Sequence, residues 1–183
     1  DSSTSRGLGD VYKRQALRGM PLVTAGSGVA IGLPGNWGLT PASAAGQTRA
    51  AGLQAVVAGS CSTATNGQVA AFIESGRPAY ALDPMRIAAG EDVVAQVLAW
   101  AEPRMQDGPV LVYSTARPDA VKQAQGALGA ARAGAMIEDA IARIAVGLVE
   151  RGVRQLIVAG GETSGAVVQA LELEQIAIGE QID

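Results

Sequence analysis

From residue 19 onward, short apolar runs alternate with longer segments in which apolar residues recur at helical spacing. We expect strands at residues 22–24, 53–58, 79–82, 109–113, 155–159 and 175–178. We expect helices at residues 63–75, 91–105, 120–129, 131–151 and 163–173. Strands that alternate with helices along a chain predict an α/β fold with a mainly parallel sheet.

The composition favours the same class of fold. Hydrophobic residues make up 48% of the 183 residues, but aromatic residues only 3% and charged residues 17%. The apolar residues are therefore mainly Ala, Val, Leu and Ile, which suit helices packed closely on both faces of a buried parallel sheet. We predict a single three-layer, Rossmann-like domain over residues 19–183.

Residues 1–18 are excluded from this domain. The first fifteen residues show neither helical nor strand periodicity. Within them, residues 10–15 resemble a translated transposase adapter, a contaminant of assembled metagenomic reads. We interpret residues 1–18 as a non-native segment and its junction. The alternative is a genuine flexible linker.

Composition also excludes several classes of function. The chain has no histidine and one cysteine, so Ser-His-Asp and Cys-His triads, histidine metal ligands and an internal disulfide bond are all ruled out. No metal-ligating set is predicted. The net charge is −3 without a basic cluster, which disfavours nucleic acids and anionic membranes as partners. Without a long apolar run or a secretory signal, we expect a cytoplasmic protein, and self-association stays open.

Glycines and hydroxyl residues follow four of the expected strands. They are Gly26, Ser27 and Gly28; Gly59, Ser60 and Ser62; Ser114; and Gly160, Gly161, Glu162, Thr163 and Ser164. Ligands of open α/β sheets bind beyond the carboxyl ends of the strands, where these residues would meet. Glycines let backbone amides approach an anion, and helix N-termini favour negative charge. The pattern predicts a phosphate-binding site.

Each of these turns also has a purely structural interpretation. Ser60 and Ser62 are placed to cap the helix that follows them, as Thr163 and Ser164 are for theirs. Glu162 either complements the helix dipole or orients the magnesium ion of a nucleotide. The P-loop motif is absent, and no glycine-rich turn is followed by the acidic residue of dinucleotide-binding domains. A dinucleotide-dependent oxidoreductase is therefore a weaker alternative.

Three blocks of the sequence resemble the nucleotide-binding domain of the four-carbon acid sugar kinases. They cover residues 26–34, 59–69 and 158–168, and the resemblance extends over residues 19–183. The third block is the most specific. The first block departs from the family pattern because Ala25 stands where the family usually has glycine.

The resemblance implies a two-domain kinase that transfers phosphate from Mg-ATP to the terminal hydroxyl of a sugar acid such as threonate, erythronate or 3-oxo-tetronate. Ser60 or Ser62 would match the family serine, and the block from Gly160 to Ser164 would hold the phosphates. The substrate domain, with the catalytic base, would precede residue 19, and a further nucleotide contact would follow residue 183. We therefore expect this chain to be incomplete and inactive alone. A non-catalytic module that binds a nucleotide or a phosphorylated metabolite is the alternative.

Overall fold

The computed structural model of the chain describes residues 15–24, 33–39, 50–60, 62–114, 126, 129–177 and 179. The chain divides into two compact units, one formed by Asp1–Gln47 with Ile178–Asp183, the other by Thr48–Ala177. The second unit holds the sheet.

Four parallel strands form one sheet in the order β2-β3-β1-β4. The strands are β1 (Leu53–Ala58), β2 (Ala79–Ala81), β3 (Val110–Tyr113) and β4 (Val153–Ala159). Strand β1 pairs with β3 on one side and with β4 on the other. The expected parallel α/β sheet is confirmed, and the predicted strands at 53–58, 79–82, 109–113 and 155–159 are found with small shifts of their ends.

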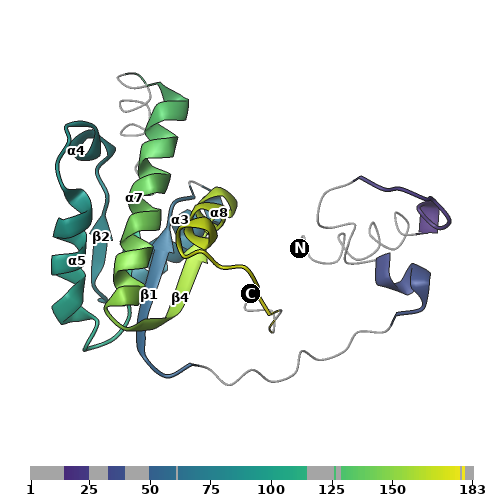
Figure 1. Ribbon diagram of the computed structural model, residues 1–183, viewed down its shortest axis with the longest axis horizontal. Coiled ribbons are helices and arrows are strands. Elements are labelled where there is room, and N and C mark those ends of the chain that lie inside the picture. Colours follow the sequence, from purple (N-terminus) through teal and green to yellow (C-terminus); the bar gives the residue numbers. More distant parts are fainter. Residues whose placement is uncertain are drawn as a thin grey trace. The chain divides into compact units, whose positions relative to one another are not determined.

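Helices cover both faces of this sheet. The helices are α3 (Thr63–Glu74), α4 (Pro84–Ala88), α5 (Val93–Arg104), α7 (Ala130–Glu150) and α8 (Gly161–Ala170). Helix α7 packs against α4, α5 and α8 on one face, as Figure 1 shows, whereas α3 contacts β3 from the other face. The sheet is therefore the middle of three layers.

The main core lies between the sheet and α7. Ile141, Ile144 and Leu148 recur at helical spacing, are completely buried, and belong to one cluster with Val57 and Val112. Burying an aliphatic side chain of this size contributes about 1.5–3 kcal/mol. The aliphatic stripe of α7 thus fixes this helix across the middle strands.

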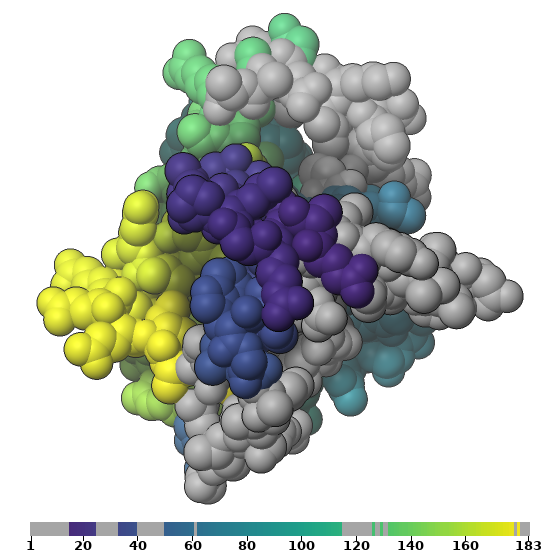
Figure 2. Space-filling model, turned by 90° about the vertical axis from the view of Figure 1, so that its right-hand side faces the viewer, coloured from purple at the N-terminus to yellow at the C-terminus, as the bar shows by residue number. Residues whose placement is uncertain are grey.

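Two expected strands are wrong. Residues 22–24, in the smaller unit, have no regular structure, and Leu22 is exposed. Residues 175–177 also lack regular structure, and Ile176 is exposed in the segment after α8, which lies at the surface (yellow in Figure 2). Short apolar runs become strands only where a neighbouring strand supplies hydrogen bonds, and neither segment has one among the described residues.

Two prolines lie in the first turns of helical segments. Pro34 is the second residue of the 3₁₀ helix Leu33–Trp37. Pro84 begins α4, and Asp83 caps this helix by accepting a hydrogen bond from the Met85 N–H at 2.8 Å. Proline fits the first turn of a helix because no partner is needed there for its missing N–H. The predicted helix at 120–129 lies almost entirely outside the described residues.

A substitution at Gly147 can test how tightly α7 packs against α5. A Cβ atom at Gly147 would lie 2.5 and 2.9 Å from the two Cδ atoms of Leu98 and 3.3 Å from its Cγ. We expect Gly147→Ala to lower the free energy of unfolding by about 1–3 kcal/mol, because Leu98 is buried and has little room to move. Urea denaturation measures the change.

The control is Gly134→Ala in the same helix. A Cβ atom at Gly134 would meet nothing within 4 Å, so we expect this variant to be more stable by about 0.5–1 kcal/mol through its higher helix propensity. Equal effects of the two substitutions would show that the contact between Gly147 and Leu98 does not limit the packing.

Candidate functional site

The carboxyl ends of three adjacent strands bring Gly59, Ser114 and Gly160 to one edge of the sheet. The Gly59 N–H donates a hydrogen bond to the Ala159 carbonyl at 3.2 Å, and the Ser114 N–H donates to the Ala58 carbonyl at 2.9 Å. Each of the three residues directly follows its strand. The structure therefore places the predicted turns after β1, β3 and β4 side by side.

The N-terminus of α8 has no side-chain cap. Its N-cap residue, Gly160, has a φ of +120°, and the first helical hydrogen bond runs from the Ser164 N–H to the Gly160 carbonyl at 2.9 Å. Within the described part of the chain, the N–H groups of Gly161, Glu162 and Thr163 donate no hydrogen bond. Three donors at the positive end of a helix are thus available to an anion.

Two of the hydroxyl groups predicted for the site stabilise the start of α3. The Ser62 Oγ accepts a hydrogen bond from the Thr65 N–H at 3.1 Å and donates one to the Thr65 Oγ1 at 3.0 Å. The Ser60 Oγ accepts from the Ser62 N–H at 3.2 Å. Ser62 is therefore engaged as an N-cap, whereas Ser60 keeps its own hydroxyl hydrogen for a further acceptor.

The hydroxyl groups of Ser164 and Thr163 differ. The Ser164 Oγ donates to the Gly160 carbonyl at 2.7 Å, so it is engaged with its own helix. Thr163 is only 3% exposed, and its hydroxyl has no partner among the described residues. A buried hydroxyl without a partner is uncommon in native proteins, where water or another bound group usually satisfies it.

Thr163 also explains why residue 59 is glycine. A Cβ atom at Gly59 would lie 2.3 Å from the Thr163 Oγ1 and 3.2 Å from the Ile141 Cδ1. A Cβ atom at Gly160 would lie 3.1 Å from the same Oγ1 and 3.1 Å from the Ser60 Cβ. The sequence suggested that these glycines admit an anion, but at Gly59 the glycine is required for the approach of α8 to β1.

Few charged groups lie around these strand ends among the described residues. Glu162 lies exposed in the first turn of α8, where its charge complements the helix dipole. The described residues contain no group of three His, Cys, Asp or Glu side chains that would hold a metal ion. They also contain no helix both long and apolar enough to cross a bilayer. The described residues of the site thus offer mainly neutral hydrogen-bond donors.

The first of the predicted glycine-rich turns is not placed at this site. Gly26, Ser27 and Gly28 lie outside the described residues, and residues 15–24 and 33–39 belong to the smaller unit. Gly59 and Ser114, which the sequence placed at strand ends without assigning them a contact of their own, lie directly after β1 and β3.

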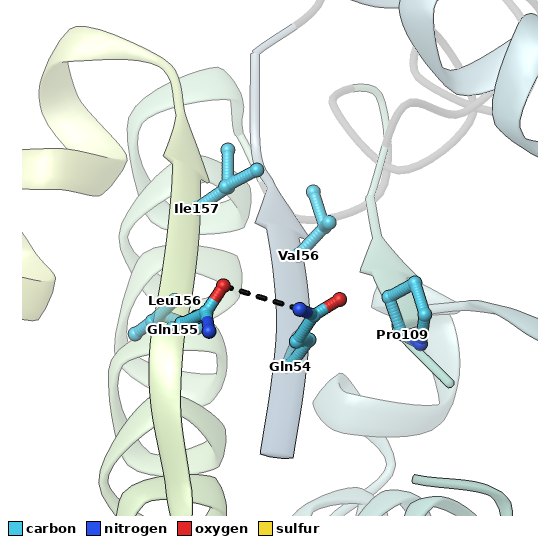
Figure 3. Close-up of a pocket in the computed structure, with 7 residues that line it drawn as sticks. Gln54, Val56, Pro109, Gln155, Leu156 and Ile157 are labelled. Carbon is cyan, nitrogen blue, oxygen red and sulfur yellow. Dashed lines mark hydrogen bonds between the residues drawn. The ribbon is translucent and has the colours of Figure 1, made fainter. Parts of the chain in front are cut away.

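A separate hollow lies on the face of the sheet opposite to α7, towards the amino ends of the strands. Figure 3 shows its lining by Gln54 and Val56 of β1, Pro109 before β3, and Gln155 and Ile157 of β4. The Gln54 Nε2 donates a hydrogen bond to the Gln155 Oε1 at 3.1 Å across the two strands. None of the predicted site residues lines this hollow.

Comparison with known families agrees with this geometry. Residues 55–183 match the family model described as the nucleotide-binding C-terminal domain. The chain belongs to this family. The match contains the turns after β1, β3 and β4, and it begins within β1.

Curated relatives are named 3-oxo-tetronate kinase. The Pseudomonas fluorescens protein is 52% identical over 168 residues, which cover 90% of this chain and 39% of the relative. The Escherichia coli protein is 40% identical over 174 residues, which cover 92% of this chain and 44% of the relative. The chain therefore spans about two fifths of the length of these kinases.

A solved structure has the same fold. The crystal structure of a Haemophilus influenzae protein of the family model DUF1537 superposes with a TM-score of 0.71 at 33% identity. The match covers 97% of this chain and 43% of the other. The resemblance to a kinase nucleotide-binding domain that the sequence motifs carried is thus confirmed at the level of the family.

The close packing at the site can be tested by a double-mutant cycle. We expect Gly59→Ala to lower the free energy of unfolding by about 1–3 kcal/mol, because its Cβ would overlap the Thr163 Oγ1. In a Thr163→Ala background the same substitution should cost clearly less, since the overlapping atom is gone. Thermal and urea denaturation of the four proteins measure both costs.

Gly67→Ala in α3 serves as the control for a glycine substitution without steric conflict. A Cβ atom at Gly67 would meet nothing within 4 Å, so no loss of stability is expected. If Gly59→Ala costs as much in the Thr163→Ala background as in the wild-type chain, the contact between Gly59 and Thr163 is not what constrains residue 59.

Proposed function

We propose that this domain binds Mg-ATP at the carboxyl ends of β1, β3 and β4, and serves in phosphoryl transfer to the terminal hydroxyl of a four-carbon sugar acid. The observation that carries the proposal is the N-terminus of α8, which has no side-chain cap, beside the buried hydroxyl of Thr163, which has no partner among the described residues. Membership in the nucleotide-binding family and relatives named 3-oxo-tetronate kinase support it.

The donors at this edge suit the nucleotide phosphates. The free N–H groups of Gly161, Glu162 and Thr163 would donate to the oxygens of one phosphate, as helix N-termini do elsewhere. Gly160 with its positive φ lets the backbone turn tightly before the helix, and Ser60 has a hydroxyl hydrogen left to donate. The proposal depends less on the other predicted contacts. These are Gly26, Ser27, Gly28, Ser62 and Ser164.

Magnesium would reach this site with its nucleotide. Mg²⁺ is usually held by substrate phosphates, water and one or two protein oxygens rather than by a dedicated cage. The absence of a carboxylate cluster among the described residues fits that mode. Glu162 contributes one of the free N–H groups and carries a carboxylate, and it is the residue that we propose would orient the hydrated ion.

Phosphoryl transfer would be a property of a protein longer than this chain. In such reactions the protein mainly positions the groups and stabilises charge. The described residues supply donors for the phosphates, and the chain spans about two fifths of the related kinases. We propose that the site for the sugar acid and the catalytic base lie in regions of the kinase that this chain does not share. The chain would therefore be inactive alone.

Isothermal titration calorimetry on the full chain tests the nucleotide assignment. We expect saturable binding of Mg-ATP and none of NAD, because the proposed donors suit phosphate and no glycine-rich turn is followed by the acidic residue that binds the ribose in dinucleotide-binding domains. Binding of NAD in preference to ATP would favour the oxidoreductase alternative. Binding of neither would contradict the proposed site. Binding of ATP without transfer in a protein of the relatives' length would favour a non-catalytic module.

The position of the phosphates can be tested with Gly161→Val. A Cβ atom at Gly161 would meet nothing within 4 Å, so the fold should persist while the side chain stands among the free N–H groups. We expect a loss of Mg-ATP affinity of about tenfold or more, equivalent to about 1.4 kcal/mol or more. Gly67→Val in α3, also without nearby atoms, is the matched control and should bind normally. Unchanged affinity of Gly161→Val would remove α8 from the site.

A further inference from the structure

Three polar side chains are buried in the described part of the chain: Thr65, Ser114 and Thr163, at 7%, 5% and 3% exposure. Only Thr65 has a hydrogen-bond partner among the described residues, the Oγ of Ser62. The hydroxyls of Ser114 and Thr163 are thus buried and unpaired within this part of the structure. Such groups destabilise the folded protein unless a ligand or water satisfies them.

Ser114 lies on the other side of β1 from Thr163. Its N–H bonds to the carbonyl of Ala58, which places Ser114 beside Gly59 across the pair of β1 and β3. Side chains alternate along a strand, and Val110 and Val112 both belong to the core on the α7 face. Ser114 continues that alternation, so its hydroxyl lies on the α7 face.

The Thr163 hydroxyl lies on the same face. A Cβ atom built at Gly59 would point to the Thr163 Oγ1 and the Ile141 Cδ1, and Ile141 is a residue of α7. Thr163, Gly59 and Ser114 therefore follow one another across the tips of β4, β1 and β3. Since residue 59 has no side chain, β1 places no bulk between the two hydroxyls.

We propose that Ser114 is a further nucleotide-binding residue, and that the phosphate chain runs across the strand tips from α8 towards β3. The phosphate at the N-terminus of α8 would be followed by a second phosphate, whose oxygen accepts a hydrogen bond from the Ser114 hydroxyl. This inference rests on the proposed binding of ATP and adds the direction in which the nucleotide lies.

The chemistry of the donors selects phosphate over other ligand groups. Among the described residues, the groups at these tips without a partner are backbone N–H groups of α8 and two hydroxyls, all of which can donate. A row of donors without a neighbouring carboxylate cluster among the described residues matches a ligand that carries acceptor oxygens along its length. A diphosphate or triphosphate has that form, whereas a single phosphate would reach only one end of the row.

The test is Ser114→Ala, titrated with AMP, ADP and ATP in the presence of Mg²⁺. Hydrogen bonds to charged groups are the stronger ones, so we expect affinity for ADP and ATP to fall about tenfold or more. Affinity for AMP should stay within about twofold of the wild type. The melting temperature without nucleotide should be unchanged or higher, because the substitution removes a buried, unpaired hydroxyl.

Thr65→Ala is the matched control for a buried hydroxyl that has a partner. It should lower the melting temperature, since it removes the partner of Ser62, and it should not discriminate ADP and ATP from AMP. A destabilised Ser114→Ala protein that binds ADP and ATP normally would show that the Ser114 hydroxyl is structural. Equal losses for all three nucleotides would place it away from the phosphate chain. If the wild-type chain binds none of them, the proposed function fails together with this inference.

Discussion

The pairing of β1 on both of its edges is the constraint on which the rest of the structure depends. Because β3 and β4 are parallel to β1, their carboxyl ends meet its end at Gly59, and the turns after all three strands converge. Gly59 then allows α8 to approach so closely that the Thr163 hydroxyl occupies the place of a side chain. The pairing of β1 and the lack of a side chain at Gly59 thus position both the core strands and the residues of the site.

The sequence predicted most of the sheet and its helices because the middle strands and α7 carry strong signals. Short runs rich in aliphatic residues mark β1 and β3, and the spacing of Ile141, Ile144 and Leu148 marks α7. The failures were short segments, at 22–24 and 175–177, whose apolar residues find no neighbouring strand among the described residues. Apolar composition is a local property, whereas strand formation depends on a partner elsewhere in the chain.

The site was predicted in part for a similar reason. The spacing of glycines and hydroxyls located the turns, because parallel strands bring their carboxyl ends together wherever they occur in a sequence. The roles within the turns required coordinates: Ser62 and Ser164 bond to backbone or neighbouring groups, whereas Thr163 and Ser114 are buried without partners among the described residues. No sequence pattern distinguishes a hydroxyl that caps a helix from one that is left for a ligand.

Strands β1 and β4 are neighbours in the sheet but lie far apart in the sequence, which affects how the chain folds during its synthesis. Gln54 and Gln155 hydrogen-bond although 101 residues separate them. At the usual rates of translation, β4 leaves the ribosome about 5–20 s after β1. Throughout that interval one edge of the central strand has no partner, and Val56 and its neighbours lack the strand that later flanks them. The edge of β1 that pairs with β4 in the finished domain therefore stays unpaired until late in synthesis.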